Sequence, residues 1–151
     1  MFAYQKKTAL AVSAFALFAF AAPAASQVVS GGTSGGVDGR DVSASTCGNG
    51  TTDGNSVGVS GCADAEARNG GTAATSTDAK ANERRAMQRS SAIARDEDER
   101  ARSRTRTVVR QGEVVRSRTT SMYKERGAPP VRESVSTRAT PTGTTTKNKP
   151  K

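Results

Sequence analysis

The sequence predicts a mostly disordered, low-complexity chain with one solvated α-helix at about 78–103, a marginal β-hairpin at about 104–119 and no globular core. The first observation behind this prediction is the scarcity of large apolar residues. Residues 27–151 contain twelve Val and one Ile but no Leu and no Phe, so these four types make up 13 of 125 residues. A share below roughly one in five, together with a large net charge, is typical of disordered chains.

The second observation is the uneven charge. The whole chain carries 23 basic and 14 acidic residues, a net charge of +9. Residues 27–79 hold two basic and six acidic residues (net −4), and residues 80–151 hold 19 basic and eight acidic residues (net +11). Such asymmetry predicts a basic segment that meets a polyanion or that folds back on the acidic half of its own chain.

Residues 1–26 have the order of a signal peptide. Lys6 and Lys7 precede the uncharged apolar run "TALAVSAFALFAFAA" at 8–22, and small residues follow that allow cleavage after Ala24 or Ser26. The segment resembles a bacterial general-secretion signal, which implies a periplasmic or secreted protein with no transmembrane segment after cleavage. An uncleaved anchor is the alternative, although 15 apolar residues are fewer than the roughly 20 that span a bilayer. We recognise no family resemblance in residues 27–151.

The next segment, 27–76, is rich in Gly, Ser and Thr and is predicted to be flexible. Residues 31–71 hold 12 of the 15 Gly, and Gly loses the most backbone entropy on ordering. Cys47 and Cys62 are the only cysteines. Behind an export signal such a pair favours one disulfide, a local staple. A metal site is the alternative, but two thiolates are only half of a tetrahedral zinc site, so we expect no metal.

A charged helix is predicted at 77–103. The chain has neither Gly nor Pro from 72 to 111, and 78–103 is rich in Ala, Arg and Glu, which favour helix. Thr75 and Asp78 have the spacing of a capping box, with Thr77 as a competing N-cap. Met87 and Ile93 are the only large apolar residues of this segment. The helix would therefore lack an apolar face and remain solvated.

An Arg-rich, hairpin-like segment is predicted at 104–126, followed by a disordered Thr/Pro/Lys tail at 127–151. A two-residue turn at Gln111-Gly112 would pair Val109 with Val114 and Val108 with Val115. In that register the arginines at 104 and 106 share one face, and those at 116 and 118 share the other. An isolated two-stranded hairpin is marginally stable in water.

The best candidate site is a cluster of basic residues at 100–126. Such a cluster can bind a polyanion through charge alone. Its members are Arg100, Arg102, Arg104, Arg106, Arg110, Arg116, Arg118, Lys124 and Arg126. Tyr123 is the only aromatic residue nearby, so the segment offers no platform for stacking bases. A solvated cationic linker with no partner is the alternative.

No catalytic constellation is present in the sequence. The chain has no His, the residue on which acid-base and nucleophilic mechanisms most often depend. We therefore expect no enzyme activity and no cofactor. The function that the sequence favours is an exported cationic protein that associates electrostatically with anionic polymers or membrane surfaces. The alternatives are a secreted structural spacer with no specific ligand and a non-specific nucleic-acid-binding protein.

Overall fold

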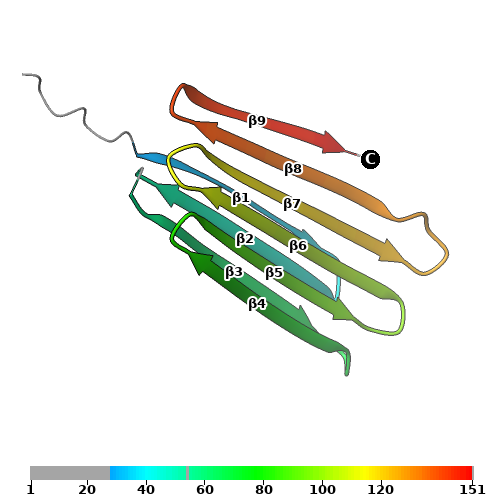
Figure 1. The fold of residues 1–151 in the computed structure, drawn as a ribbon. Helices are drawn as coiled ribbons and strands as arrows, with labels where there is room; N and C mark the ends of the chain where they lie inside the picture. Colours follow the sequence, from blue (N-terminus) through cyan, green and yellow to red (C-terminus); the bar gives the residue numbers. More distant parts are fainter. Residues whose placement is uncertain (1–27, 54, 151) are drawn as a thin grey trace, which may run out of the picture.

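The protein is a sandwich of two antiparallel β-sheets (Figure 1). The computed structural model describes residues 28–53 and 55–150. The smaller sheet consists of β1 (Val29–Asp38), β2 (Val42–Thr52) and β3 (Val57–Ala67). The larger sheet consists of β4 (Thr72–Asn82), β5 (Arg85–Arg95), β6 (Glu99–Arg110), β7 (Val114–Glu125), β8 (Val131–Thr140) and β9 (Gly143–Pro150). The predicted leader at 1–26, with both of its cleavage points, lies outside the described residues.

The connections are short and the strand order follows the chain order in both sheets. The chain leaves the smaller sheet after β3 through a turn in which Asn69 and Gly70 have positive φ, 51° and 78°. Strand β2 lies over β5, β6 and β7, whereas β1 lies over β7 and β8. Strand β3 lies over β4 and β5, whereas β9 at the other edge of the larger sheet extends beyond the smaller sheet (Figure 1).

The prediction of disorder without a globular core is wrong, because this core does not depend on large apolar side chains. Two small apolar clusters lie near the two ends of the strands, one around Val109 and Val115 and the other around Val42 and the alanines of β5. Between them lies a band of buried hydroxyls. Each Ser or Thr buries less apolar area than a Leu, but paired hydroxyls can be buried at little cost.

The hydroxyl band joins the two sheets through hydrogen bonds. Thr46 of β2 shares hydrogen bonds with Ser103 (2.7 Å) and Thr105 (2.8 Å) of β6. Thr33 of β1 shares hydrogen bonds of 2.7 and 2.8 Å with Ser117 and Thr119 of β7. Buried polar groups need partners, and here each sheet supplies partners for the other. This network fixes which residues face each other across the interior.

Glycines of the smaller sheet allow the close approach that these hydrogen bonds require. A Cβ added at Gly35 would lie 2.8 Å from the Thr119 Cγ2 atom, and one added at Gly31 would lie 3.0 Å from the Cβ of Ala139. The Gly-rich segment predicted to be flexible is therefore ordered as β1, β2 and β3. The entropy cost of ordering Gly is offset here by the close packing of the two sheets that Gly permits.

The predicted helix at 78–103 is wrong, since the structure has β4, β5 and most of β6 there. In β5 the buried residues alternate strictly with outward-facing ones, and β4 is exposed along its whole length. The alternation escaped recognition because the inward residues are Ala, Ser and Gln. The predicted caps are absent too: Thr75, Thr77 and Asp78 lie within β4, where the Thr77 hydroxyl shares a 3.2 Å hydrogen bond with that of Ser90.

The prediction of a marginal hairpin at 104–119 is also wrong. Strands β6 and β7 do form a hairpin here, but it is longer and forms the middle of a six-stranded sheet. The turn has three residues, with Gly112 at φ 63°, so Val109 pairs with Val115. A slip of one residue in register moves side chains to the other face. The register set by the three-residue turn places both Val109 and Val115 in the core. The predicted disordered tail forms β8 and β9.

The predicted disulfide is present. Cys47 and Cys62 are direct cross-strand partners in β2 and β3, with Cα atoms 5.0 Å apart. The bond lies on the outer face of the smaller sheet, away from the hydroxyl band. A disulfide is compatible with an oxidising compartment. Within residues 28–53 and 55–150, no helix is long and apolar enough to span a membrane.

Candidate polyanion-binding face

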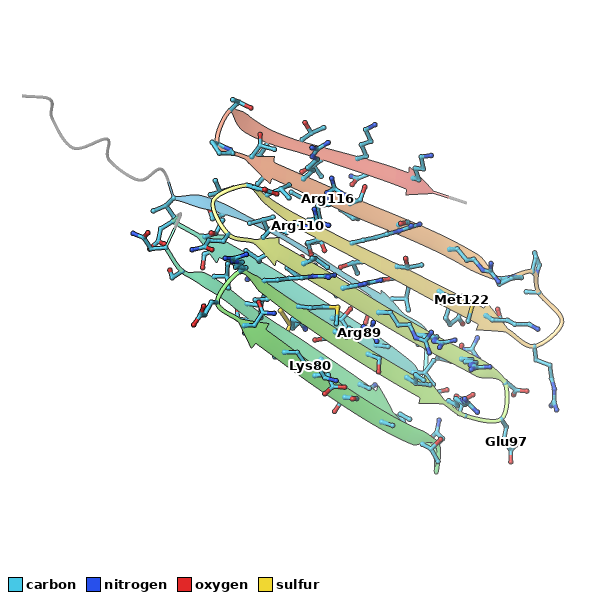
Figure 2. All side chains as sticks on the ribbon, in the orientation of Figure 1. Lys80, Arg89, Glu97, Arg110, Arg116 and Met122 are labelled. Atoms are coloured by element: carbon cyan, nitrogen blue, oxygen red, sulfur yellow. A yellow bond between two sulfur atoms is a disulfide. The ribbon has the colours of Figure 1, made fainter. Side chains whose placement is uncertain are left out.

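The outer face of the larger sheet gathers basic side chains from all six strands. We call it the basic face. Burial and strand register place on it Lys80, Arg85, Arg89, Arg95, Arg100, Arg102, Arg104, Arg106, Arg110, Arg116, Arg118, Lys124, Arg132, Arg138, Lys147 and Lys149. Figure 2 shows Lys80, Arg89, Arg110 and Arg116 among them. Among the described strands, Asp78 is the only acidic residue on this face.

The alternation of residues along each strand creates this face. In β6, residues 99, 101, 103, 105, 107 and 109 are buried, and five of the six residues between them are Arg. Successive residues of one face lie about 6.6–6.8 Å apart along a strand. Arg100, Arg102, Arg104 and Arg106 therefore form a straight line of four guanidinium groups. One period-two alternation along β6 therefore directs Ser and Thr into the interior and Arg to the outer face.

Basic residues also stand directly opposite one another across the strands. Arg106 of β6 has Arg89 of β5 on one side and Arg118 of β7 on the other. Arg116 of β7 is paired with Arg138 of β8. Neighbouring strands are about 4.8 Å apart, and like charges directly opposite destabilise a sheet. Several such like-charge pairs occur on the basic face, and each of them destabilises the sheet.

Few protein groups compensate these charges. The only ion pairs among the described residues are Arg68–Glu66 and Arg126–Asp98, and none of those four residues lies on the basic face. The Arg118 Nε–H group donates a 3.2 Å hydrogen bond to the hydroxyl of Ser134. The Nε atoms of Arg100 and Arg102 are buried without a hydrogen-bond partner in the described chain. Those two Nε atoms are not accessible to a ligand, but the exposed guanidinium N–H groups of this face have no carboxylate partner among the described residues and remain available.

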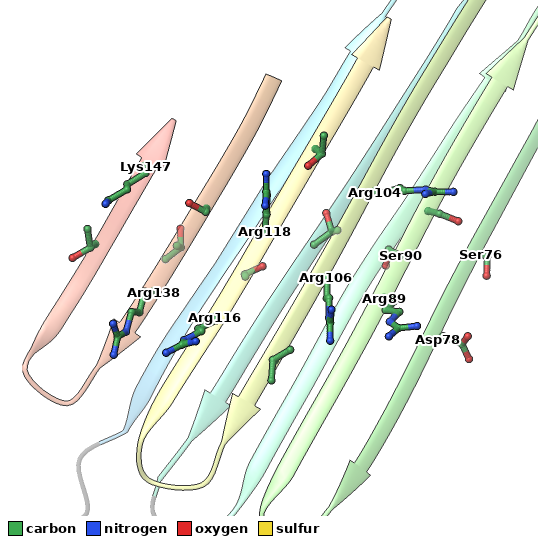
Figure 3. A pocket seen from close by; sticks show the side chains of 18 residues that line it. Ser76, Asp78, Arg89, Ser90, Arg104, Arg106, Arg116, Arg118, Arg138 and Lys147 are labelled. Atoms are coloured by element: carbon green, nitrogen blue, oxygen red, sulfur yellow. The ribbon is translucent and has the colours of Figure 1, made fainter. Parts of the chain in front are cut away.

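A hollow of about 1070 Å³ runs across the middle of the basic face (Figure 3). It extends from Asp78 on β4 to Lys147 on β9. Its cationic lining consists of Arg89, Arg104, Arg106, Arg116, Arg118, Arg138 and Lys147. Hydroxyls such as those of Thr120 and Ser136 lie between these groups. The hollow thus offers charged donors and neutral hydrogen-bonding groups to one ligand.

The structure brings together eight of the nine basic residues predicted as a site. Arg104 and Arg106 share one face with Arg116 and Arg118, whereas the predicted register put the two pairs on opposite faces. Arg126 is separate: it lies in the β7–β8 turn and pairs with Asp98 at 3.1 Å. The change has the same origin as the change in valine pairing, since a three-residue turn replaces the predicted two-residue turn.

Sequence reasoning missed the other half of the basic face. Arg85, Arg89 and Arg95 were assigned to the helix, and the basic residues of β8 and β9 to a disordered tail. A period-two signal was present within each strand: the basic residues on this face are 85, 89 and 95 in β5, 132 and 138 in β8, and 147 and 149 in β9, all separated by even numbers of positions inside their strand. Searching for alternation with Ser, Thr and Ala counted as core residues would have revealed it.

The acidic residues of the first half do not neutralise the basic face. Asp38, Asp64 and Glu66 are exposed on the outer side of the smaller sheet, the opposite surface of the sandwich. The expectation that the basic half could fold back on the acidic half is therefore met only at Asp78. The molecule has one strongly cationic surface and one weakly anionic surface.

A buried carboxylate ties the end of the sandwich together. Glu99, 7% exposed, accepts hydrogen bonds from the backbone N–H of Asp41 (3.0 Å) and the hydroxyl of Tyr123 (2.8 Å). The N–H of Asp41 and then the Tyr123 hydroxyl lower the pKa of Glu99. The hydrogen bond to Glu99, with burial next, raises the pKa of Tyr123 to about 12. These groups are structural: they hold the β1–β2 turn onto the larger sheet.

The described residues contain no group of three or more His, Cys, Asp or Glu placed to hold a metal ion. No protein-family model, curated protein or solved structure matches this chain.

Proposed function

We propose that the basic face binds an anionic polymer bearing phosphate, sulfate or carboxylate groups. The observation that carries the proposal is the collection of sixteen Arg and Lys from six strands on one face, with Asp78 as the only acid there. Unpaired like charges in direct cross-strand contact cost stability. A bound polyanion would neutralise the repulsion between these cations and add attraction between each cation and the ligand.

The type of cation supports an oxyanion ligand. Twelve of the sixteen basic residues are Arg, whose planar guanidinium binds phosphate and carboxylate groups in a bidentate way. The strands hold these groups in a fixed array. A disordered cationic chain would have to order each side chain on binding, at a cost in entropy.

The dimensions support a polymer. Five strand spacings cover about 24 Å across the sheet. The twelve residues of β6 extend about 40 Å. A single small anion would contact a small part of this area, whereas an extended chain can contact several rows at once. Tyr123 points inward to Glu99, so the face lacks an aromatic platform and recognition rests on charge and not on bases.

The compartment is part of the proposal. The Cys47–Cys62 disulfide and the predicted leader both favour an exported protein, periplasmic or secreted. Envelope polymers and phosphate-bearing lipid surfaces then become the anions that the protein meets. We propose a binding role and no enzymatic activity, since apart from Asp78 the polar groups of the basic face are cations, hydroxyls and amides, with no paired nucleophile and base.

Salt dependence tests the proposal. Binding of the oxidised protein to fluorescently labelled polyphosphate, heparin and duplex DNA is measured by anisotropy over a series of salt concentrations. For duplex DNA the log–log slope is about −0.9 per phosphate neutralised. Replacing Arg104, Arg106, Arg116 and Arg118 by Gln should reduce the slope by up to about 3.6.

The matched control changes Arg40 and Arg68, which lie off the basic face, to Gln. This variant should keep the wild-type slope. We expect comparable binding to the three polymers at equal charge density. Binding that persists at high salt, or that prefers one base sequence, contradicts charge-based recognition. Absence of binding at low salt would leave the structural spacer as the better explanation.

A further inference from the structure

The two edges of the larger sheet are complementary to each other. We propose that copies of this protein associate edge to edge, with β9 of one copy pairing antiparallel with β4 of the next. The partner is therefore a second copy of the chain. The inference concerns the sheet edges and does not require that the basic face bind a polyanion.

The β4 edge is open to an added strand. All eleven residues of Thr72–Asn82 are exposed, and their pairing with β5 continues without interruption from residue 72 to residue 82. Natural edge strands are usually blunted by Pro, by bulges, by several charges or by shortness. β4 has no Pro and no bulge, and its side chains are small except for Lys80 and Asp78. Its outer row of backbone groups is free among the described residues.

The strand directions match. Six strands alternate in direction from β4 to β9, so β4 and β9 run in opposite directions. When a second copy keeps the orientation of the first, its β4 lies antiparallel to β9 of the first copy. This is the pairing used throughout the sheet. The basic faces of both copies then point to the same side.

Charge favours one register. Asp78 belongs to a cross-strand row that passes through Arg89, Arg106, Arg118 and Ser136 and ends at Lys147 of β9. If the row continues into the next copy, that copy's Asp78 lies beside Lys147. An opposite-charge pair directly across two strands is stabilising. The only acid of the basic face is thus located where a neighbouring copy would present a lysine.

Such an interface is heterologous, because β4 and β9 are different surfaces. Every assembly keeps one free β4 edge at one end and one free β9 edge at the other, so association is open-ended and gives a linear array. Repulsion between the cationic faces opposes it at low salt. Screening at high salt, where the Debye length falls to about 3 Å at 1 M, removes that repulsion. Self-association should therefore rise with salt, whereas polyanion binding falls.

Engineered cysteines test the pairing. Ala79 and Thr146 are exposed and end a single row on the inner side of the sheet, at its two opposite edges. Five strand spacings, about 24 Å, prevent a disulfide between them within one copy. In A79C/T146C, mild oxidation of the folded protein at high salt should give a ladder of disulfide-linked oligomers with 79–146 links, identified by mass spectrometry. Each single variant can give dimers only.

The matched control is T120C/T146C, which moves one cysteine from the edge to the middle of β7. It should give no ladder. Sedimentation provides a second readout: D78K should weaken self-association about 1.5- to 5-fold, and D78K/K147D should restore it. A ladder no longer than the control's, or a protein that stays monomeric at high salt and high concentration, would overturn the proposal. Loss of polyanion binding alone would not affect it.

Discussion

Replacing Gly50 by Ala tests the close packing that explains this fold. Gly50 is buried on the inner face of β2. An added Cβ would overlap the Cγ2 atom of Val109 and would lie 2.9 Å from Val115 Cγ1 and 3.2 Å from Thr107 Cγ2. Val109 and Val115 are 0% and 1% exposed, so neither side chain has solvent into which it can move. The sheets would have to separate locally.

The expected loss follows from overpacking. Forcing an extra carbon into a packed core costs about 1–3 kcal/mol. For a folded unit of this size, that corresponds to a fall in Tm of roughly 4–15 °C. Removing Gly also restricts the unfolded chain and offsets about 0.4–1 kcal/mol. The net effect should remain destabilising because the overlapped atom belongs to a buried side chain.

The control is the same substitution at Gly58, on the outer side of β3. The nearest atom to an added Cβ there is the hydroxyl of Thr51 at 2.9 Å, which can rotate away. Gly58→Ala should therefore be neutral or stabilising. Thermal and denaturant unfolding of the oxidised proteins compare the two. If Gly50→Ala is as stable as Gly58→Ala, the sheets do not pack at the distance argued here.

Three further predictions concern Glu99, Tyr123 and the disulfide. Because folding lowers the pKa of Glu99, its carboxylate contributes stability above its unfolded pKa, and this contribution is lost as the pH falls below about 4. The unfolding midpoints of wild type and Glu99→Gln should therefore converge at acidic pH. A constant difference between the two midpoints from pH 7 to pH 3 would contradict this. The raised pKa of Tyr123 has the opposite sign: its contribution is complete below pH 10 and is lost as the pH rises to about 12, so its phenolate should titrate by ultraviolet absorbance near 12 and not near 10. Reducing the disulfide between Cys47 and Cys62 should lower the free energy of unfolding by about 3 kcal/mol in the chain-entropy model, while the sandwich stays folded. Identical denaturant midpoints with and without reductant would show that the disulfide does not stabilise the fold.

The helix prediction shows how composition can mislead. Residues 78–103 contain good helix formers and no Gly or Pro, and intrinsic propensity is a weak guide that tertiary context overrides. In β5 the decisive feature is that Ala86, Gln88, Ser90 and Ala92 alternate with outward-facing residues. Apolar periodicity could not detect this pattern, because the inward residues are small or polar. They belong in the interior only because a second sheet supplies hydrogen-bond partners and close contacts.

Half of the basic face could be predicted from the sequence. The run of alternating Arg at 100–106 is evident in the sequence and predicted a polyanion-binding segment. Its extension to Arg89 on one side and Arg138 on the other depends on strands that pair across many residues. Register decides the face of every side chain, and here the three-residue turn around Gly112 decides the register. Neither the turn length nor the neighbours in the sheet can be derived from local propensity.

By itself the sequence determined the charge asymmetry, the concentration of basic residues after residue 80 and the pairing of the only two cysteines, because these are properties of composition and count. Only the tertiary structure decided that the chain has a core, that its glycines serve sheet packing and that the basic residues share one face. The physical reason is that a Gly or a buried Thr contributes little alone. Its contribution arises from the opposite sheet, as a close contact or a hydrogen-bond partner, and the hydrogen-bond partners of Thr33 and Thr46 there lie 57 to 86 residues away in the chain.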